Sequence, residues 1–108
     1  DQAIPYRNKV RSALHDILHP GTVMVLPTAA SPPPLLYAPE DALDRFRSQS
    51  IALLCLAPLA GLPQISIPAA ALDGIPVGLS IMAWDGGDEA LLGLASALEP
   101  CVRAGRML

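Results

Sequence analysis

The chain has 108 residues, of which 52% are hydrophobic and only 16% are charged, and its net charge is −3. Soluble domains carry roughly 25% charged residues, so this composition indicates a chain that packs against a larger body. A negative chain without a basic patch excludes the nucleic-acid-binding class. The length allows one domain at most, or a part of one.

A long uncharged stretch, residues 48–72, raises the possibility of a membrane span. A spanning helix needs about 20 apolar residues, and this stretch is long enough. Three prolines interrupt it, however, and each limits a helix to the segment before it. Gln64 and Ser66 would also lack partners in lipid. A helix, a turn and a strand explain the stretch better, and no membrane partner is expected.

The start of the chain and its cysteines indicate the compartment. Asp1 leads directly into Pro5 and a charged segment, without the pattern of a secretory signal. The two cysteines, Cys55 and Cys101, do not form a disulfide framework, and Cys55 lies in an apolar run that predicts a buried thiol. We therefore expect a reducing, cytoplasmic setting.

The first elements are a helix and a strand. Ile4 to His19 predicts an amphipathic helix, with apolar residues at helical spacing (Tyr6, Val10, Leu14, Ile17 and Leu18). Pro20-Gly21 ends it. Thr22 to Leu26 is almost continuously apolar, which is typical of a strand that is covered on both faces by helices.

A proline-rich loop and a long helical segment follow. Ala29 to Pro39 contains three consecutive prolines and predicts a stiff, extended loop. The loop is a connector, a docking site for a proline-recognition module, or the rim of a site. Glu40 to Ala60 predicts one helix or two, with Pro58 ending or bending it. Beyond Gln49 every face is apolar, so we expect that half to be buried.

The last third predicts two strands and a helix. Gln64 to Pro68 resembles a short strand, Ala69 to Leu72 crosses over to an Asp73-Gly74 turn, and Pro76 to Trp84 alternates like a second strand. Glu89 to Glu99 predicts a helix that Asp88 caps and that Pro100 follows. Its expected buried stripe is Leu91, Leu92, Ala95 and Leu98. We expect Trp84 to pack in the core or, alternatively, to line a pocket.

The predicted order is α-β-loop-α-β-β-α, which indicates an α/β fold with one layer of helices against about three strands. So few strands with so much apolar surface leave edges and faces open. The rest of the sheet is expected to come from elsewhere.

The sequence contains no complete catalytic or metal-binding set. His15 and His19 share one side of a helix, but no third ligand is signalled nearby. A nucleophile needs a neighbouring base, whereas the serines are scattered singly outside glycine-rich turns. Lys9 is expected to be solvated on the first helix. No catalytic residue, metal or cofactor is therefore assigned to this chain.

Four segments in series nevertheless resemble the amidase signature family. They are Val23 to Thr28, Gly61-Leu62-Pro63 with Ile65 to Pro68, Gly74 to Leu79, and the closing Asp88, Leu91, Leu92, Ala95 and Glu99 pattern. The resemblance covers residues 5–100 and corresponds to the C-terminal quarter of such an enzyme. It implies that residues 1–108 are the C-terminal segment of an amidase-signature domain, within a large mixed β-sheet flanked by helices.

The resemblance also implies a function. Members of the family hydrolyse amides to acids and ammonia or amines with a Ser–Ser–Lys triad, and that triad lies in an N-terminal part with no matching position here. The expected partners are that catalytic part, a small amide substrate and a second copy of the full enzyme. The chain departs from the family's pattern at Thr22, Pro58 and Ser80, and the absence of the usual Asn and Gln at the last two argues against amidotransferase subunits. The proline loop and Gly86-Gly87-Asp88 favour small amidases of the indoleacetamide-hydrolase kind.

Three residues are predicted to line the substrate pocket. Thr28 stands at a strand end, and Gln49 and Ser50 stand where the helix becomes wholly apolar. In this interpretation the chain completes the sheet and lines part of the pocket. The alternative is a non-enzymatic fragment that binds a partner or self-associates through its exposed apolar surface.

Overall fold

The computed structural model describes residues 2–106 and contains four helices and three strands in that range. They are α1 (Ala3–Ile17), β1 (Met24–Pro27), α2 (Glu40–Leu54), α3 (Leu56–Ala60), β2 (Gln64–Leu72), β3 (Ile75–Met82) and α4 (Asp88–Arg106). The predicted segment Glu40 to Ala60 is thus two helices, which join at Cys55. Pro58 lies in the first turn of α3, where a backbone N–H has no helical partner to lose.

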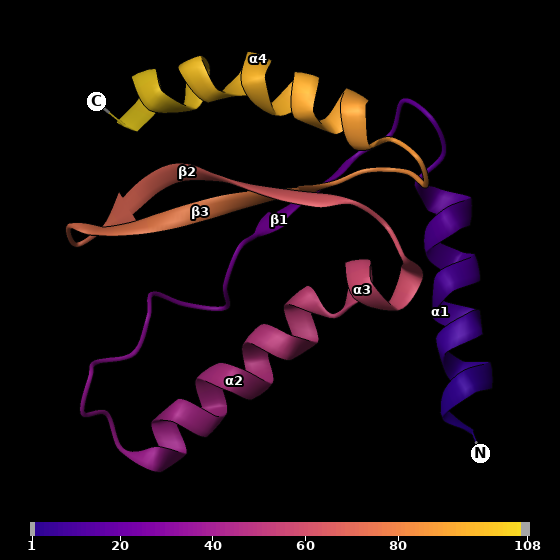
Figure 1. The fold of residues 1–108 in the computed structure, drawn as a ribbon. Coiled ribbons are helices and arrows are strands. Elements are labelled where there is room, and N and C mark those ends of the chain that lie inside the picture. The colour runs from indigo at the N-terminus through magenta and orange to yellow at the C-terminus, as the bar shows by residue number, and fades with distance from the viewer. Residues whose placement is uncertain (1, 107–108) are drawn as a thin grey trace.

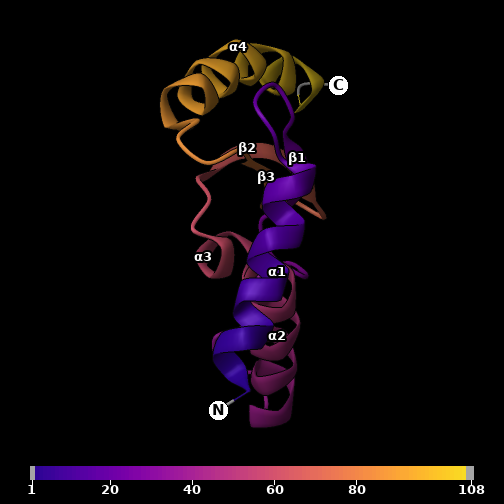
Figure 2. The same cartoon turned by 90° about the vertical axis from the view of Figure 1, so that its right-hand side faces the viewer.

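The elements form layers around an antiparallel sheet of strand order β1-β3-β2. Helix α4 covers one face of the sheet, while α2 and α3 lie beyond the other face and α1 runs along its end (Figure 1). The view at 90° shows the same stack, with the sheet between α4 and the other helices (Figure 2). The molecule is a slab of 40 × 38 × 16 Å.

Strands β2 and β3 form one hairpin. The predicted crossover at Ala69 to Leu72 is wrong, because these residues continue β2 and pair with β3 up to Leu72 opposite Ile75. The turn residues Asp73 and Gly74 both have positive φ, 52° and 81°. Such a two-residue turn matches the twist of the strands and favours Asp-Gly. One extra residue of β2 bulges between Pro68 and Ala70.

The face of the sheet toward α4 is well packed. Ile81 and Ala83 are fully buried there with Leu91 of α4, and the half-buried Trp84 packs against them as expected. Other parts of the α4 prediction are wrong. Leu92 is 59% exposed, since it falls outside the face that meets the sheet. Asp88 opens the helix rather than capping it, because the first helical bond runs from Leu91 N–H to Gly87 C=O.

Pro100 lies inside α4 rather than after its end. Proline removes one helical hydrogen bond, but the helix continues on both sides of it. The side chains of Glu99 and Arg103 form an ion pair across this position, and this pairing raises the pKa of Arg103. The pair is one helical turn apart, the spacing at which opposite charges support a helix.

The opposite face of the sheet holds a second core, built from β1, β3, α1 and α3. Its buried members are Leu14, Leu18, Leu26, Ala57, Ala60, Leu62 and Met82. The Gly-Leu-Pro segment reverses the chain here. Gly61 ends α3 with a left-handed backbone at φ 67°, Leu62 enters the core, and Pro63 C=O accepts a hydrogen bond from Ala83 N–H. His15 bonds to Ala60 C=O at 2.9 Å and so ties α1 to α3.

Several predicted buried positions are exposed in this chain. Helix α2 has no fully buried residue, and Ile51 in its apolar half is 66% exposed. Strand β1 lies at an edge with Val25 57% exposed, so it is not covered on both faces. Tyr6 and Ile17 of α1 are 69% and 54% exposed. These elements carry apolar side chains as expected, but no other part of residues 2–106 packs over those that are exposed.

The accessible surface area of the chain is larger than that of a compact protein of the same mass. It measures 7371 Å², whereas a compact protein of this mass exposes about 5,700 Å². The radius of gyration is 15.9 Å, against about 13 Å for a compact domain of this length. The chain thus has defined cores on both faces of its sheet and an excess of uncovered surface around α2.

Candidate functional site

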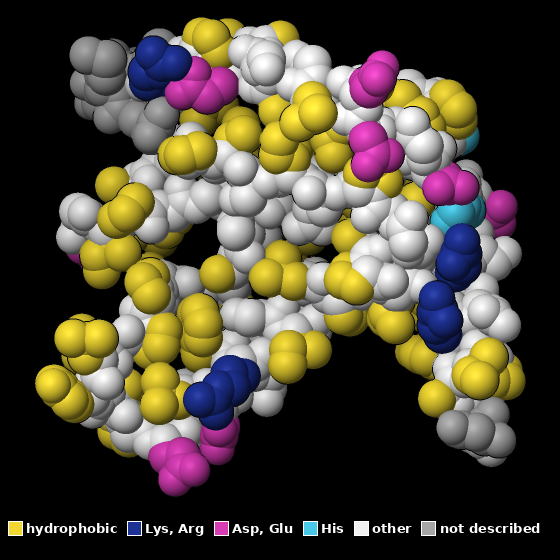
Figure 3. All heavy atoms as spheres, viewed as in Figure 1, with side chains coloured by type: hydrophobic (Ala, Val, Ile, Leu, Met, Phe, Trp, Pro, Cys, Tyr) yellow, Lys and Arg dark blue, Asp and Glu magenta, His cyan; other side chains and the backbone are white. Residues whose placement is uncertain are grey.

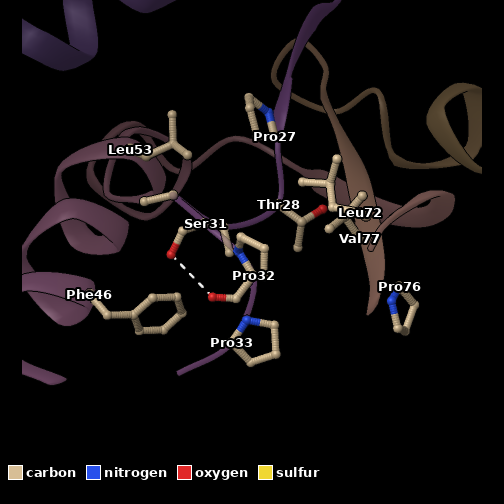
Figure 4. A pocket seen from close by; sticks show the side chains of 13 residues that line it. Pro27, Thr28, Ser31, Pro32, Pro33, Phe46, Leu53, Leu72, Pro76 and Val77 are labelled. Carbon is tan, nitrogen blue, oxygen red and sulfur yellow. Dashed lines mark hydrogen bonds between the residues drawn. The ribbon is translucent and has the colours of Figure 1, made fainter. Parts of the chain in front are cut away.

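A cavity of about 430 Å³, cavity 1, opens between α2, the start of the proline loop and the β2–β3 hairpin. The molecule is hollowed between the sheet and α2, with hydrophobic side chains around the opening (Figure 3). Phe46 and Leu53 project from α2 on one side, and Leu72 and Val77 come from the hairpin on the other, with Thr28 between them (Figure 4). This cavity fits an apolar group of moderate size.

A second cavity of about 410 Å³, cavity 2, lies beside the first and is more polar. Its lining residues are Thr28, Leu54, Ala57, Pro58, Leu62, Gln64, Ser66 and Ser80. Thr28 lines both cavities. It therefore stands at the boundary between an apolar space and one that offers hydrogen bonds.

Three hydroxyl groups meet at this boundary, one from each strand or its end. Thr28 Oγ1 lies 2.6 Å from Ser66 Oγ and 2.9 Å from Ser80 Oγ. Gly78 leaves the room for them, because a Cβ at this position would lie 2.7 Å from Thr28 Oγ1 and 2.8 Å from Ser66 Oγ. We call Thr28, Ser66 and Ser80 the hydroxyl cluster. Ser80 is 1% exposed and Ser66 is exposed toward solvent.

The β-bulge brings the hydroxyl cluster together. An unbroken hairpin with its turn at Asp73-Gly74 would place Ser66 opposite Ile81, with Ser80 on the other face. The extra residue between Pro68 and Ala70 shifts the register by one, so that Ser66 pairs with Ser80. A one-residue shift moves side chains to the opposite face. On the other side of β3, Thr28 N–H bonds to Gly78 C=O at 3.2 Å and extends the pairing of β1.

Sequence reasoning missed Ser66 and Ser80, because each serine stands alone in its segment. The Asp73-Gly74 turn was the available signal, since it joins the two segments as a hairpin. The turn alone would have given the wrong pairing, because no strong sequence signal marks the bulge. The convergence of these serines became visible only in the structure.

The three predicted pocket residues lie in different surroundings. Thr28 lines both cavities, whereas Gln49 and Ser50 line neither. Gln49 is exposed on α2. Ser50 is half-buried, and no described residue forms a hydrogen bond with its buried Oγ. The structure therefore brings Thr28 together with two other hydroxyls but does not bring Gln49 and Ser50 to it.

Among the residues that the structure describes, none that lines either cavity is charged. The described residues also contain no cluster of three His, Cys, Asp or Glu side chains that could hold a metal ion. No helix within residues 2–106 has the length and apolarity that crossing a membrane requires. The site therefore offers hydroxyl groups, the Gln64 amide and apolar side chains.

Comparison with known proteins shows which family the chain resembles. The family model named Amidase matches residues 1–92. Amidase 1 of Arabidopsis thaliana is 38% identical, over 91% of this chain and 24% of its own length. Translocon at the outer membrane of chloroplasts 64 of Pisum sativum is 36% identical, over 80% of this chain and 14% of its own length.

A solved structure supports the same relationship. A glutamyl-tRNA(Gln) amidotransferase subunit from Thermotoga maritima superposes with a TM-score of 0.80 and 26% identity, over 91% of this chain and 21% of that one. This confirms the predicted α/β fold class. The chain spans about a quarter or less of the length of these relatives. By sequence and by fold, the chain belongs to the amidase family.

Proposed function

We propose that this chain is the C-terminal segment of an amidase that hydrolyses a carboxylic amide to an acid and ammonia or an amine. The match of residues 1–92 to the amidase family carries this proposal. No described residue that lines either cavity is a lysine, so this part of the chain brings no Ser–Ser–Lys set to the cavities. That triad belongs in this proposal to an N-terminal part of the same enzyme.

The segment has two roles in this proposal. It completes the enzyme's β-sheet, for which the open edge at β1 and the exposed Val25 provide the surface. It also forms one wall of the acyl pocket, for which cavity 1 provides the space. The N-terminal catalytic part would cover α2, where Ile51 is 66% exposed, and would close the pocket from the other side.

The remaining expectations belong to the same proposal. Thr28, Gln49 and Ser50 would line the pocket, the substrate would be a small amide, and the full enzyme would form a homodimer in the cytoplasm. One relative is named for the outer membrane of chloroplasts, so the location needs a direct measurement. The kinship to small amidases of the indoleacetamide-hydrolase kind also stays a prediction.

The test is an amide-hydrolysis assay on the intact protein that carries this chain. Ammonia release from a panel of small amides is measured with the native protein and with the presumed catalytic lysine of the N-terminal part replaced. We expect activity that this replacement abolishes. A folded protein without activity on any amide would instead favour a non-enzymatic binding role through the exposed surface of α2.

A further inference from the structure

Helix α3 depends on partners outside itself. It has only five residues, and so short a helix is not stable alone. The last carbonyl groups of a helix have no partner within it. The N–H groups of Gly61 and Leu62 both bond to Ala57 C=O, and the carbonyl groups of Leu59 and Ala60 bond to side chains of another helix. Those side chains therefore decide where the end of α3 lies.

Helix α1 supplies these partners from basic side chains that are four residues apart. His15 Nε2 donates to Ala60 C=O at 2.9 Å, and Arg7 Nε donates to Leu59 C=O at 3.4 Å. Between them in sequence, the Arg11 guanidinium lies 3.6 Å from where a Cβ on the glycine after α3 would stand. Residues at this spacing share one helix face, and the carbonyl end of a helix attracts donors and cations.

The bond of His15 is the strongest of these contacts. It is the shorter of the two hydrogen bonds, and it is half-buried, whereas the bond of Arg7 is exposed to solvent. A carbonyl oxygen only accepts, so Nε2 of His15 carries the hydrogen. A hydrogen bond that is shielded from water contributes more than one that water can replace. His15 therefore holds the end of α3 more firmly than its neighbours on α1 do.

The segment that His15 holds forms a wall of cavity 2. Ala57, Leu62 and Gln64 line this cavity. Gln64 is also the first residue of β2, two residues before Ser66 of the hydroxyl cluster. A shift of α3 would thus move the wall of cavity 2 and the start of β2 together. No residue of α1 lines either cavity, so His15 acts only through α3, and all of these contacts lie within the described part of the chain.

We propose that His15 is a positioning residue of the amidase site, which fixes α3 and the Gly-Leu-Pro reversal through Ala60 C=O and so holds the wall of cavity 2 in place for the substrate. This inference rests on the proposed amidase function and adds a residue to the same site. Arg7 and Arg11 support the same helix end from the exposed side. Helix α1 thereby contributes to substrate binding without touching the substrate.

The test compares the two histidines of α1 in the intact protein, with the small amide that the native protein hydrolyses fastest. His15→Ala should raise KM about three- to tenfold, as the loss of one hydrogen bond allows, and should leave kcat within about twofold, because the triad lies elsewhere in this proposal. His19→Ala is the matched control, since His19 is exposed and its Nδ1 lies 3.3 Å from the neighbouring Thr22 Oγ1. It should leave KM within about twofold.

A conservative variant separates positioning from a loss of bulk. His15→Gln keeps a side-chain N–H donor of similar reach. It should return KM to within about twofold of the native value, since the bond to Ala60 C=O can form again. A KM as high in His15→Gln as in His15→Ala would overturn the role of the hydrogen bond.

Hydrogen exchange measures the same linkage without turnover. In His15→Ala, the amide hydrogen of Leu62 at the reversal should exchange about three- to tenfold faster. The amide hydrogen of Leu91, which bonds at the start of α4, should keep its native rate. Thermal unfolding shows that each variant is folded at the assay temperature. Equal acceleration at Leu62 and Leu91 would indicate a global loss of stability and would overturn the positioning role.

The outcomes distinguish this inference from the proposed function. Local exchange at Leu62 in His15→Ala, with no amide hydrolysed by the native protein, would support the linkage from α1 to α3 and contradict the enzyme. Hydrolysis with an unchanged KM in His15→Ala would support the enzyme and overturn the inference. Equal changes of KM in His15→Ala and His19→Ala would also overturn it.

Discussion

The two sides of the sheet differ in how completely this chain covers them. Toward α4, Ile81 and Ala83 are 0% exposed and Leu91 closes over them. Toward α2, no residue of the helix is fully buried, although the second half of the helix has no charged residue after Arg47. Hydrophobicity in a sequence thus indicates that a segment will be covered, but it does not indicate that its own chain covers it.

The largest expected effect tests this contrast with matched isoleucines. Ile81→Ala removes a side chain from a sealed core and should lower the free energy of unfolding by about 2–5 kcal/mol. Ile51→Ala removes a 66% exposed side chain and should change the stability of the 108-residue chain by less than about 0.5 kcal/mol. Urea denaturation of the two variants measures the difference.

The variants Ile81→Ala and Ile51→Ala can also be compared in the intact protein. If the catalytic part covers α2, Ile51→Ala becomes destabilising there by more than about 1 kcal/mol, because a contact is then lost. Equal effects of Ile81→Ala and Ile51→Ala in the 108-residue chain would contradict the description of two unequal sides.

A pair of glycines tests the crowding at the hydroxyl cluster. Gly78→Ala would place a Cβ 2.7 Å from Thr28 Oγ1 and should cost about 1–3 kcal/mol, as overpacking does. Gly93 lies in α4 with nothing within 4 Å of its added Cβ, so Gly93→Ala should stabilise by roughly 0.5–1 kcal/mol through helix propensity. Thermal unfolding measures both, and a tolerated Gly78→Ala would show that the hydroxyls have room to move.

A small effect on stability is expected at Ser50. Its Oγ is buried without a partner among the described residues, so Ser50→Ala should be neutral or stabilise by up to about 1 kcal/mol. Ser50→Phe in the intact enzyme should instead change the ratio of activity on small and large amides. An unchanged ratio would remove Ser50 from the pocket, and a destabilising Ser50→Ala would mean that its hydroxyl has a partner in the intact enzyme.

Much of the local structure followed from sequence patterns. Apolar spacing located the helices, Asp73-Gly74 located the turn, and Gly61-Leu62-Pro63 marked the reversal after α3. Proline was a poorer guide, because Pro58 and Pro100 both lie inside helices. Removing one N–H is tolerable in a first turn, and near the end of a long helix the packing of the preceding turns outweighs it.

The candidate site was only partly predictable. Thr28 stood out because it ends an apolar strand, and it lines both cavities. Gln49 and Ser50 were inferred from the change of composition along a helix, which does not specify which residues face a space. Ser66 and Ser80 were not assigned to the site from the sequence, because each serine stands alone in its segment and their meeting depends on the register of two paired strands.

The sequence by itself determined the family, the order of the elements and the shortage of covering surface, because these depend on local pattern and composition. Only the tertiary structure decided that the Ala69 to Leu72 segment belongs to a hairpin, that one bulged residue sets Ser66 opposite Ser80, and that Thr28 joins them. A single residue of register selects which side chains share a face, and local propensity does not encode that choice.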